Sequence, residues 1–520
     1  MQRKQKVLAI GLDALDPDVF ESLIQQGHLK NLANFHRQAA FGRLTNVPHY
    51  RAETPWTTFL TGCYPEKLGY WGPITYDPRT YEAYEIGAYD FQQVLPFYAL
   101  EEACRVAVFD MSQARLSEQV NGVQILGWGS HSQQCHSGSS PPDLLQEIIH
   151  RYGPHPAYDE ESLGTNDHAN PYDRKDQHHL KEQLLTGIQR RSQICRDLWQ
   201  REPWDLFLTL FGEVHAAEHS FWQTLYPHPL SEFAETGAFL EILQAVDRAV
   251  GEILEEVGSE TIVAIFAAHG MGPNVQDIPS MALLPEFMYR WTFPGKAALT
   301  PNHYSVALLP LKSYPSQHWK FAVWQGVTET AQLDLASPLA QMEAGDSLNW
   351  QPNNWYRPLW PRMQAFALPS FSEGCIRINL KGREAQGCVD PAEYEALCDH
   401  LCQALAQLRD GRTGAPMVES IDRTRSSKNL LDPKAPPADL IVHWQEEYPT
   451  DVMVSPDLGC IGPVPYFRTG GHRSKGFLMI QGPGIPASVL PTGEAIDLPV
   501  TLLKLMGVEP PDYMRGRSLL

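Results

Sequence analysis

The chain has 520 residues, of which 41 are Lys or Arg and 61 are Asp or Glu, so its formal net charge is −20. So acidic a surface argues against binding to nucleic acid polymers and to anionic membranes, but it permits a small phosphorylated substrate held through a metal ion. The nine cysteines lack disulfide-framework spacing and no apolar run reaches membrane-spanning length, so we expect a cytoplasmic, globular protein.

The first predicted strand covers Val7 to Leu12 and leads directly into Asp13. Open α/β sheets bind ligands at the carboxyl ends of their strands, so Asp13 is a candidate binding residue. Its alternative role is to cap the helix that begins nearby, although Asp16 can also do this.

A turn rich in hydroxyl groups follows, from Ala52 to Pro65. A threonine beside a metal ion is a plausible nucleophile, because the cation can hold it as alkoxide. For Thr57, Thr58 and Thr61 we prefer the alternative, in which threonines cap a helix and pack against it.

The apolar run from Leu206 to Phe211 predicts a buried strand, and two histidines follow it. His215 and His219 are four residues apart, so on a helix they share one face and can bind one divalent metal ion. The alternative is a pair of surface histidines on a helix that buries its aromatic residues.

Two more histidines adjoin predicted strands. His269 comes just after the strand Ile262 to Ala267, and His472 precedes the apolar run Gly476 to Gln481. A histidine at a strand end followed by glycines has few packing reasons to be there, which makes His269 a candidate ligand.

Alternating strand and helix patterns predict one α/β core with a mostly parallel sheet between helix layers. From about Asn274 to Ala367 the chain is rich in Pro, Trp, Tyr and Gln and has weak periodicity. We therefore assign residues 1–274 and 368–520 to the core and residues 275–367 to an inserted cap.

Taken together, these motifs resemble the alkaline phosphatase superfamily, and within it the type I phosphodiesterase/nucleotide pyrophosphatase branch. The resemblance spans nearly the whole chain and rests on six motifs in the family's order: Asp13 after the first strand, Thr-Phe-Leu-Thr-Gly-x-x-Pro at 58–65, x-x-His-x-x-x-His-x-Phe-Trp at 213–222, His-Gly-Met-Gly at 269–272, Gly-His-Arg at 471–473, and Leu-Pro-Val-Thr-Leu-Leu…Met-Gly-Val at 498–508. It implies an alkaline-phosphatase-like fold and a metal-dependent phosphodiesterase or phosphohydrolase. The expected substrate is a phosphodiester or pyrophosphate bond in a small metabolite.

The resemblance also implies a zinc site made of His215, His219 and His472, in which His215 stands where the family usually has a carboxylate. Three imidazoles with an open position suit catalytic zinc, whose bound water can ionise near neutral pH, and Mn²⁺ is an alternative.

The resemblance implies a second metal position, held by Asp13, the nucleophile and an Asp-His pair. In this chain the pair is reduced to His269, because Ala268 stands where the family has the Asp. Glu53 or water would have to complete the ligand set. We therefore expect this position to be empty or exchangeable.

The nucleophile is displaced as well. Counted back from Thr61-Gly62 with the family's spacing, the nucleophile position falls on Ala52, which has no hydroxyl. Thr54 is the nearest hydroxyl, and it can act as the nucleophile if the turn is two residues shorter than in the family. Otherwise water at the three-histidine site attacks directly. Arg473 or Lys475 could contact outer phosphate oxygens, with ordinary solvated charge as the alternative.

Two other functions stay open. Ala52 and Ala268 favour a catalytically degenerate member that binds zinc and a phosphorylated ligand or a protein partner. A transferase that moves a phosphoryl-linked headgroup could use the same site.

Overall fold

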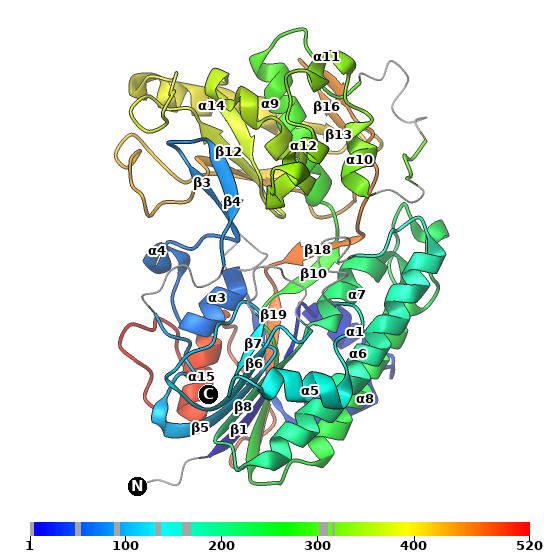
Figure 1. Cartoon of the computed structure of the whole chain (residues 1–520), viewed down its shortest axis with the longest axis vertical. Helices are drawn as coiled ribbons and strands as arrows, with labels where there is room; N and C mark the ends of the chain where they lie inside the picture. The colour runs from blue at the N-terminus through cyan, green and yellow to red at the C-terminus, as the bar shows by residue number, and fades with distance from the viewer. Residues whose placement is uncertain are drawn as a thin grey trace. The chain divides into compact units, whose positions relative to one another are not determined.

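The structure is a computed structural model that describes residues 5–46, 54–87, 94–129, 137–158, 168–300, 310–314 and 318–520 (Figure 1). The chain divides into two compact units. The first contains residues Met1–Tyr70, Gly87–Gly272 and Arg468–Leu520, and the second contains Trp71–Ile86 and Pro273–Phe467. No helix in the described ranges is long and apolar enough to cross a membrane.

A nine-stranded sheet forms the centre of the first unit, in the order β20-β2-β19-β9-β1-β8-β5-β6-β7. The run from β9 to β6 is parallel throughout, whereas β19 and β7 pair antiparallel with their neighbours, which confirms the mostly parallel sheet. The strands are β1 (Lys6–Leu12), β2 (Ala40–Leu44), β5 (Glu101–Phe109), β6 (Val120–Leu126), β7 (Gly138–Ser140), β8 (Leu206–Phe211), β9 (Thr261–Ala267), β19 (Gly476–Gln481) and β20 (Ser488–Val489).

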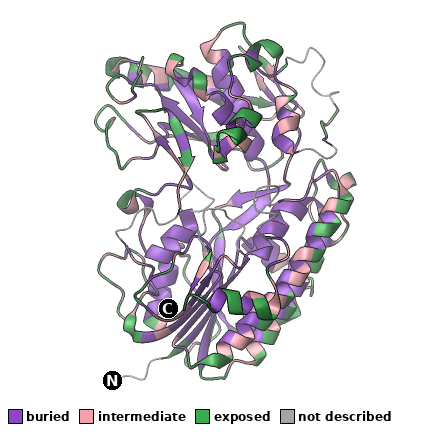
Figure 2. Cartoon of the chain, viewed as in Figure 1, coloured by how far each residue is buried: buried purple, intermediate pink, exposed green. Residues whose placement is uncertain are grey.

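The central strands are apolar along their length because both faces of the sheet are covered (Figure 2). In β8, Phe207 and Phe211 join one core while Leu206, Leu208 and Leu210 join the other. The first core includes residues of α1 (Pro17–Gln25), α2 (Lys30–Gln38), α5 (Leu144–Tyr152), α6 (Arg174–Arg201), α7 (Glu213–Phe221) and α8 (Ala238–Glu255). The second includes residues of α3 (Thr54–Thr61) and α15 (Asp497–Leu505). Helix layers on both sides of the sheet confirm the predicted α/β architecture.

Two short strands and one short helix complete the first unit's regular structure near the site. β10 (Gly270–Pro273) and β18 (Gly470–Arg473) form a two-stranded sheet, and α4 (Pro65–Leu68) follows α3.

The second unit is built on a four-stranded antiparallel sheet in the order β11-β12-β15-β14. The strands of the whole second unit are β3 (Ile74–Asp77), β4 (Glu82–Glu85), β11 (Ala365–Leu368), β12 (Gly374–Ile378), β13 (Arg409–Asp410), β14 (Val418–Arg423), β15 (Leu440–Trp444), β16 (Met453–Ser455) and β17 (Gly459–Ile461). Its helices are α9 (Leu284–Thr292), α10 (Trp319–Trp324), α11 (Glu329–Gln332), α12 (Pro338–Glu343), α13 (Pro352–Trp355) and α14 (Tyr394–Ala406).

This second unit is larger than the segment 275–367 that the sequence predicts as an insertion. β11 ends at Leu368 but pairs with β12, which pairs with β15, so backbone hydrogen bonds tie the chain beyond residue 368 to the same unit. The hairpin β3–β4 joins it too, since the Tyr81 hydroxyl donates a 2.7 Å hydrogen bond to Asn379 Oδ1.

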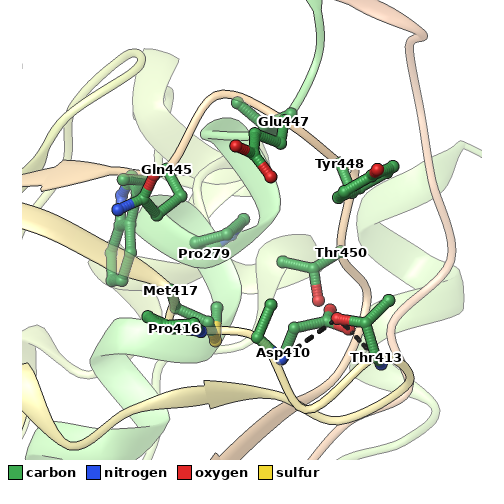
Figure 3. A pocket seen from close by; sticks show the side chains of 12 residues that line it. Pro279, Asp410, Thr413, Pro416, Met417, Gln445, Glu447, Tyr448 and Thr450 are labelled. Atoms are coloured by element: carbon green, nitrogen blue, oxygen red, sulfur yellow. Dashed lines mark hydrogen bonds between the residues drawn. The ribbon is translucent and has the colours of Figure 1, made fainter.

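A pocket of about 230 Å³ lies within the second unit, between the ends of β13 and β15 (Figure 3). Its Asp410 carboxylate accepts hydrogen bonds from the backbone N–H and the hydroxyl of Thr413. None of the candidate site residues that the structure describes lines this pocket.

Candidate functional site

Three of the candidate histidines come together in the first unit. His215 and His219 lie one turn apart on α7, which begins two residues after β8 ends, and His472 lies on β18. All three are buried, and one ring nitrogen from each lies within 4.8 Å of the others. The Nε2 atoms of His215 and His472 are 2.9 Å apart. The cluster forms because His215 and His219 share one face of α7 and because α7 starts at the end of β8, where the sheet presents its ligand-binding edge.

The close approach of β18 to α7 fixes the orientation of His219. Its Nδ1–H donates a 2.7 Å hydrogen bond to the carbonyl of Gly470, which leaves Nε2 with a lone pair. A Cβ atom at Gly470 would lie 2.1 Å from the carbonyl oxygen of Glu218, so this contact requires glycine. The backbone of β18 therefore presets the tautomer of His219 that a metal ligand needs.

The cluster's electrostatics also favour neutral imidazoles. Burial, and then the nearby Arg468 guanidinium and the neighbouring histidines, hold the pKa of His219 well below its usual value. A neutral ring can donate its lone pair to a metal at neutral pH without first losing a proton. Three buried imidazoles whose nitrogens converge fit a divalent ion such as zinc.

Asp13 and His269 lie beside this cluster. Each follows a central parallel strand, β1 or β9, and His269 Nε2 is 3.5 Å from Asp13 Oδ1. The ring centroid of His269 is 5.5 Å from that of His472 and 6.4 Å from that of His215. The structure thus brings all five predicted metal ligands to one edge of the sheet.

Among the residues that the structure describes, Asp13 and His269 alone do not make up a full set of metal ligands. Asp13 Oδ1 accepts a 3.0 Å hydrogen bond from the indole Nε1–H of Trp56, and the Trp56 ring packs edge-on against His269. Ala268 contributes no ligand side chain, and Glu53 lies outside the described residues. Two protein ligands are too few for a tight closed site.

Thr54 is the first residue of α3 and is buried. Its carbonyl accepts the hydroxyl hydrogens of Thr57 and Thr58, and Thr61 donates to the Thr57 carbonyl, as expected of threonines that pack against their own helix. In the ranges that the structure describes, no hydrogen bond joins the Thr54 hydroxyl to the three histidines. Ala52 lies outside those ranges.

Arg468 is a basic residue that contacts the cluster. Its Nη1 lies 3.2 Å from His219 Nε2 and 3.4 Å from His168 Nε2. Arg473 instead packs against Gly272, where an added Cβ would lie 1.8 Å from Arg473 Nε. Successive side chains of a strand point to opposite faces, so Arg473 and its neighbour His472 diverge.

Sequence reasoning missed Arg468 and did not single out His168. Arg468 falls in an irregular segment, and His168 follows a polar, turn-rich stretch, so neither has periodicity or motif spacing to mark it. A buried acidic group, Glu218, also escaped notice. Burial, together with Asp16 and Asp13, raises its pKa well above the usual value.

A buried ion cluster holds the start of α7. Arg191 Nε donates to both carboxylate oxygens of Glu213, at 2.8 and 2.9 Å, and Arg191 Nη2 donates to Asp110 Oδ2 at 2.8 Å. His155 Nε2 lies 3.1 Å from Glu213 Oε1. Because Glu213 is the first residue of α7, this cluster anchors the helix that carries His215 and His219.

Three solved structures illustrate what the whole chain is similar to. Phosphonoacetate hydrolase from Sinorhizobium meliloti 1021, in complex with phosphonoformate, is 12% identical over 97% of this chain and 96% of that chain, with a TM-score of 0.48, and the complex with phosphonoacetate is also similar. Human ectonucleotide pyrophosphatase/phosphodiesterase 5 is 10% identical over 98% of this chain and 97% of that chain, with a TM-score of 0.49. A mutant of alkaline phosphatase PafA is 10% identical over 100% of this chain and 99% of that chain, with a TM-score of 0.49. No curated protein matches the chain.

A family model gives the assignment. The model described as type I phosphodiesterase/nucleotide pyrophosphatase matches residues 7–310, which is more than half of the chain. The matched segment contains Asp13, His215, His219 and His269, whereas His472 lies beyond it. The chain therefore belongs to the type I phosphodiesterase/nucleotide pyrophosphatase family, a family of phosphoester hydrolases.

Proposed function

We propose that this protein is a metal-dependent hydrolase of phosphate esters that acts on a phosphodiester or pyrophosphate bond in a small phosphorylated metabolite. The observation that carries the proposal is the cluster of His215, His219 and His472, whose ring nitrogens converge in a buried site. Family membership supplies the reaction class.

The residues around the cluster suit this chemistry. A zinc or manganese ion, when bound, supplies Lewis-acid polarisation of the phosphoryl oxygen. His219 is held in the ligand tautomer by the Gly470 carbonyl, and Asp13 orients the His269 ring at the side of the cluster. Burial of these groups excludes water and so strengthens each electrostatic contact with the substrate.

Two nucleophiles are compatible with this site. Thr54 lies at the first turn of α3, two residues before the Trp56 that contacts Asp13. Attack by its hydroxyl gives a covalent intermediate, whereas attack by water needs no protein nucleophile.

One feature favours a second candidate function, a non-catalytic protein that binds zinc and a phosphorylated ligand or a protein partner. The position beside Asp13 has Ala268 where the family has a carboxylate, and the Trp56 indole N–H engages the Asp13 carboxylate. A member that has lost catalysis can keep the three-histidine site while the other position degenerates.

Hydrolysis of aryl phosphate mono- and diesters, measured with added Zn²⁺ or Mn²⁺, separates the two functions. The hydrolase is expected to show metal-stimulated turnover that falls by ~100-fold or more in His472→Ala. His178→Ala is the matched control, since His178 is an exposed histidine paired with Glu235. Absence of turnover under every metal condition favours the binding protein. An unchanged rate in His472→Ala would show that the activity comes from elsewhere.

A further inference from the structure

The pocket of about 230 Å³ in the second unit shares no residue with the three-histidine cluster, which belongs to the first unit. Part of its wall is apolar, because Val275, Met417 and Trp444 line it and all three are buried. A concave, largely apolar wall with a few fixed polar groups is typical of sites that bind small molecules. The polar groups then determine which small molecule fits.

A buried carboxylate lines this pocket. Asp410 is 8% exposed, and its Oδ1 accepts three hydrogen bonds of 2.7–3.1 Å, from the backbone N–H groups of Arg412 and Thr413 and from the Thr413 hydroxyl. In the part of the chain that the structure describes, no donor reaches Oδ2. A buried carboxylate oxygen without a hydrogen bond is costly, so Asp410 favours a ligand that donates one.

Several donors of the lining are already used, whereas acceptors stay available. The Thr450 hydroxyl donates to a backbone carbonyl at 3.1 Å, and the Trp444 indole N–H donates to a serine hydroxyl at 2.7 Å. The Glu447 carboxylate is exposed and accepts no hydrogen bond from the described residues. Figure 3 shows Glu447 and Tyr448 across the pocket from Asp410. A ligand that donates hydrogen bonds therefore finds carboxylate acceptors on two sides.

The charges of the lining favour a cation. Asp410 and Glu447 line the pocket, and no Lys, Arg or His of the described ranges does. Four charged residues adjoin lining positions in the sequence, two of each sign: Arg409, Arg412, Glu446 and Asp451. Lys312 interacts with Asp451 but lines a different cavity. A bound cation would thus contact two carboxylates and no cationic side chain of the lining.

We propose that this pocket binds a small primary amine with an apolar body, in its charged ammonium form. An ammonium group has three N–H donors and no acceptor, which matches the carboxylates of Asp410 and Glu447. The Tyr448 ring, which is 64% exposed, can lie over the cation. The apolar body packs against Met417 and Trp444. Neither the three-histidine cluster nor hydrolysis is needed for this binding.

Ligand-observed NMR titrations of the full-length protein test this with three probes of similar shape, namely benzylamine, benzyl alcohol and benzoate. The wild type is expected to bind benzylamine about 10- to 100-fold more tightly than benzyl alcohol, the range of one charge-assisted hydrogen bond. Benzoate should bind most weakly, because its charge has the same sign as the two carboxylates.

Asp410→Asn keeps an Oδ1 that can accept from Thr413 and removes the charge. It should weaken benzylamine binding by about 10-fold or more and hardly change benzyl alcohol binding. Glu447→Gln should also weaken benzylamine binding, and this exposed position is tolerant of substitution if Asp410→Asn fails to fold. Asp457→Asn is the matched control, since it removes the same charge from an exposed position between β16 and β17. It should bind benzylamine as the wild type does.

An amine nitrogen can also bind a metal ion, so the benzylamine titration is repeated on His472→Ala, which should keep the wild-type affinity. Loss of benzylamine binding in His472→Ala would place the amine at the histidine cluster and overturn the proposal. Two other results would overturn it as well. One is a wild type that binds benzylamine no more tightly than benzyl alcohol. The other is an unchanged benzylamine affinity in both Asp410→Asn and Glu447→Gln.

Discussion

The substitution Arg191→Met, in the buried ion cluster at the start of α7, should lower the free energy of unfolding by an amount that depends on pH. Arg191 is completely buried, and its guanidinium lies over the rings of Phe109, Trp128 and Phe211 at 5.2–5.8 Å while it pairs with Glu213 and Asp110. Methionine is apolar and flexible enough to fill part of the vacated space. The substitution therefore leaves two buried carboxylates without their cation.

Removing one partner of a buried ion pair costs about 3–5 kcal/mol, and we expect a loss in this range near pH 8. Burial raises the pKa of Glu213, but Arg191 and His155 outweigh it and lower the pKa from 4.5 to about 2. Ionised Glu213 thus stabilises the wild type above pH 4.5, and this contribution disappears as the pH falls from 4.5 towards 2. In the variant, burial acts on Glu213 without the guanidinium, so this carboxyl group takes up a proton more readily and the loss should shrink near pH 5.

Guanidinium chloride unfolding at both pH values measures this effect. Arg201→Met is the control, since Arg201 forms more exposed pairs with Glu147 and Asp197 and should lose no more than about 1 kcal/mol. Zinc affinity should also fall in Arg191→Met, because α7 carries two of the three histidines. A loss below about 1 kcal/mol near pH 8, or an equal loss at both pH values, would refute this reasoning.

Two further substitutions test other parts of the site. Asp16 Oδ1 caps α1, yet burial raises its pKa from 3.8 to about 6, so ionised Asp16 destabilises the fold as the pH rises through this interval. Asp16→Asn keeps the capping oxygen and should raise the free energy of unfolding by about 2–3 kcal/mol near pH 8. Near pH 3.5 the free energy of unfolding should hardly change, and an equal effect at both pH values would contradict this reasoning. Thr54→Ala should lower the hydrolysis rate by several orders of magnitude if Thr54 is the nucleophile and only slightly if water attacks, so single-turnover kinetics on an aryl phosphodiester separates the two routes.

The central sheet and its ligand-bearing edge could be predicted from sequence because both follow local rules. β1, β8 and β9 are apolar runs of strand length; Asp13 follows β1 directly, and His269 lies two residues after β9. Parallel neighbours end at the same edge of a sheet, so strand order alone brings these side chains together. The spacing of His215 and His219 places them on one helix face in the same way.

The remaining features depend on contacts between distant segments, which no local pattern encodes. Nothing near Trp56 indicates that its indole N–H reaches Asp13, and nothing near Arg468 indicates that it reaches His219. The second unit extends beyond residue 367 because β12 pairs with β15 across more than 60 residues of intervening chain. The position of Arg473 does follow from a local rule. Successive side chains of a strand point to opposite faces, so Arg473 on β18 points away from the face that carries His472.

Zinc content measured by elemental analysis tests the central claim most directly. After loading with zinc and removal of excess metal, the wild type and the His178→Ala control should each hold about one ion per chain, because the three-histidine site has the better ligand set. His219→Ala, which removes the imidazole held by Gly470, should retain almost none. Equal zinc content in His219→Ala and wild type would contradict the assignment of His215, His219 and His472 as the metal site.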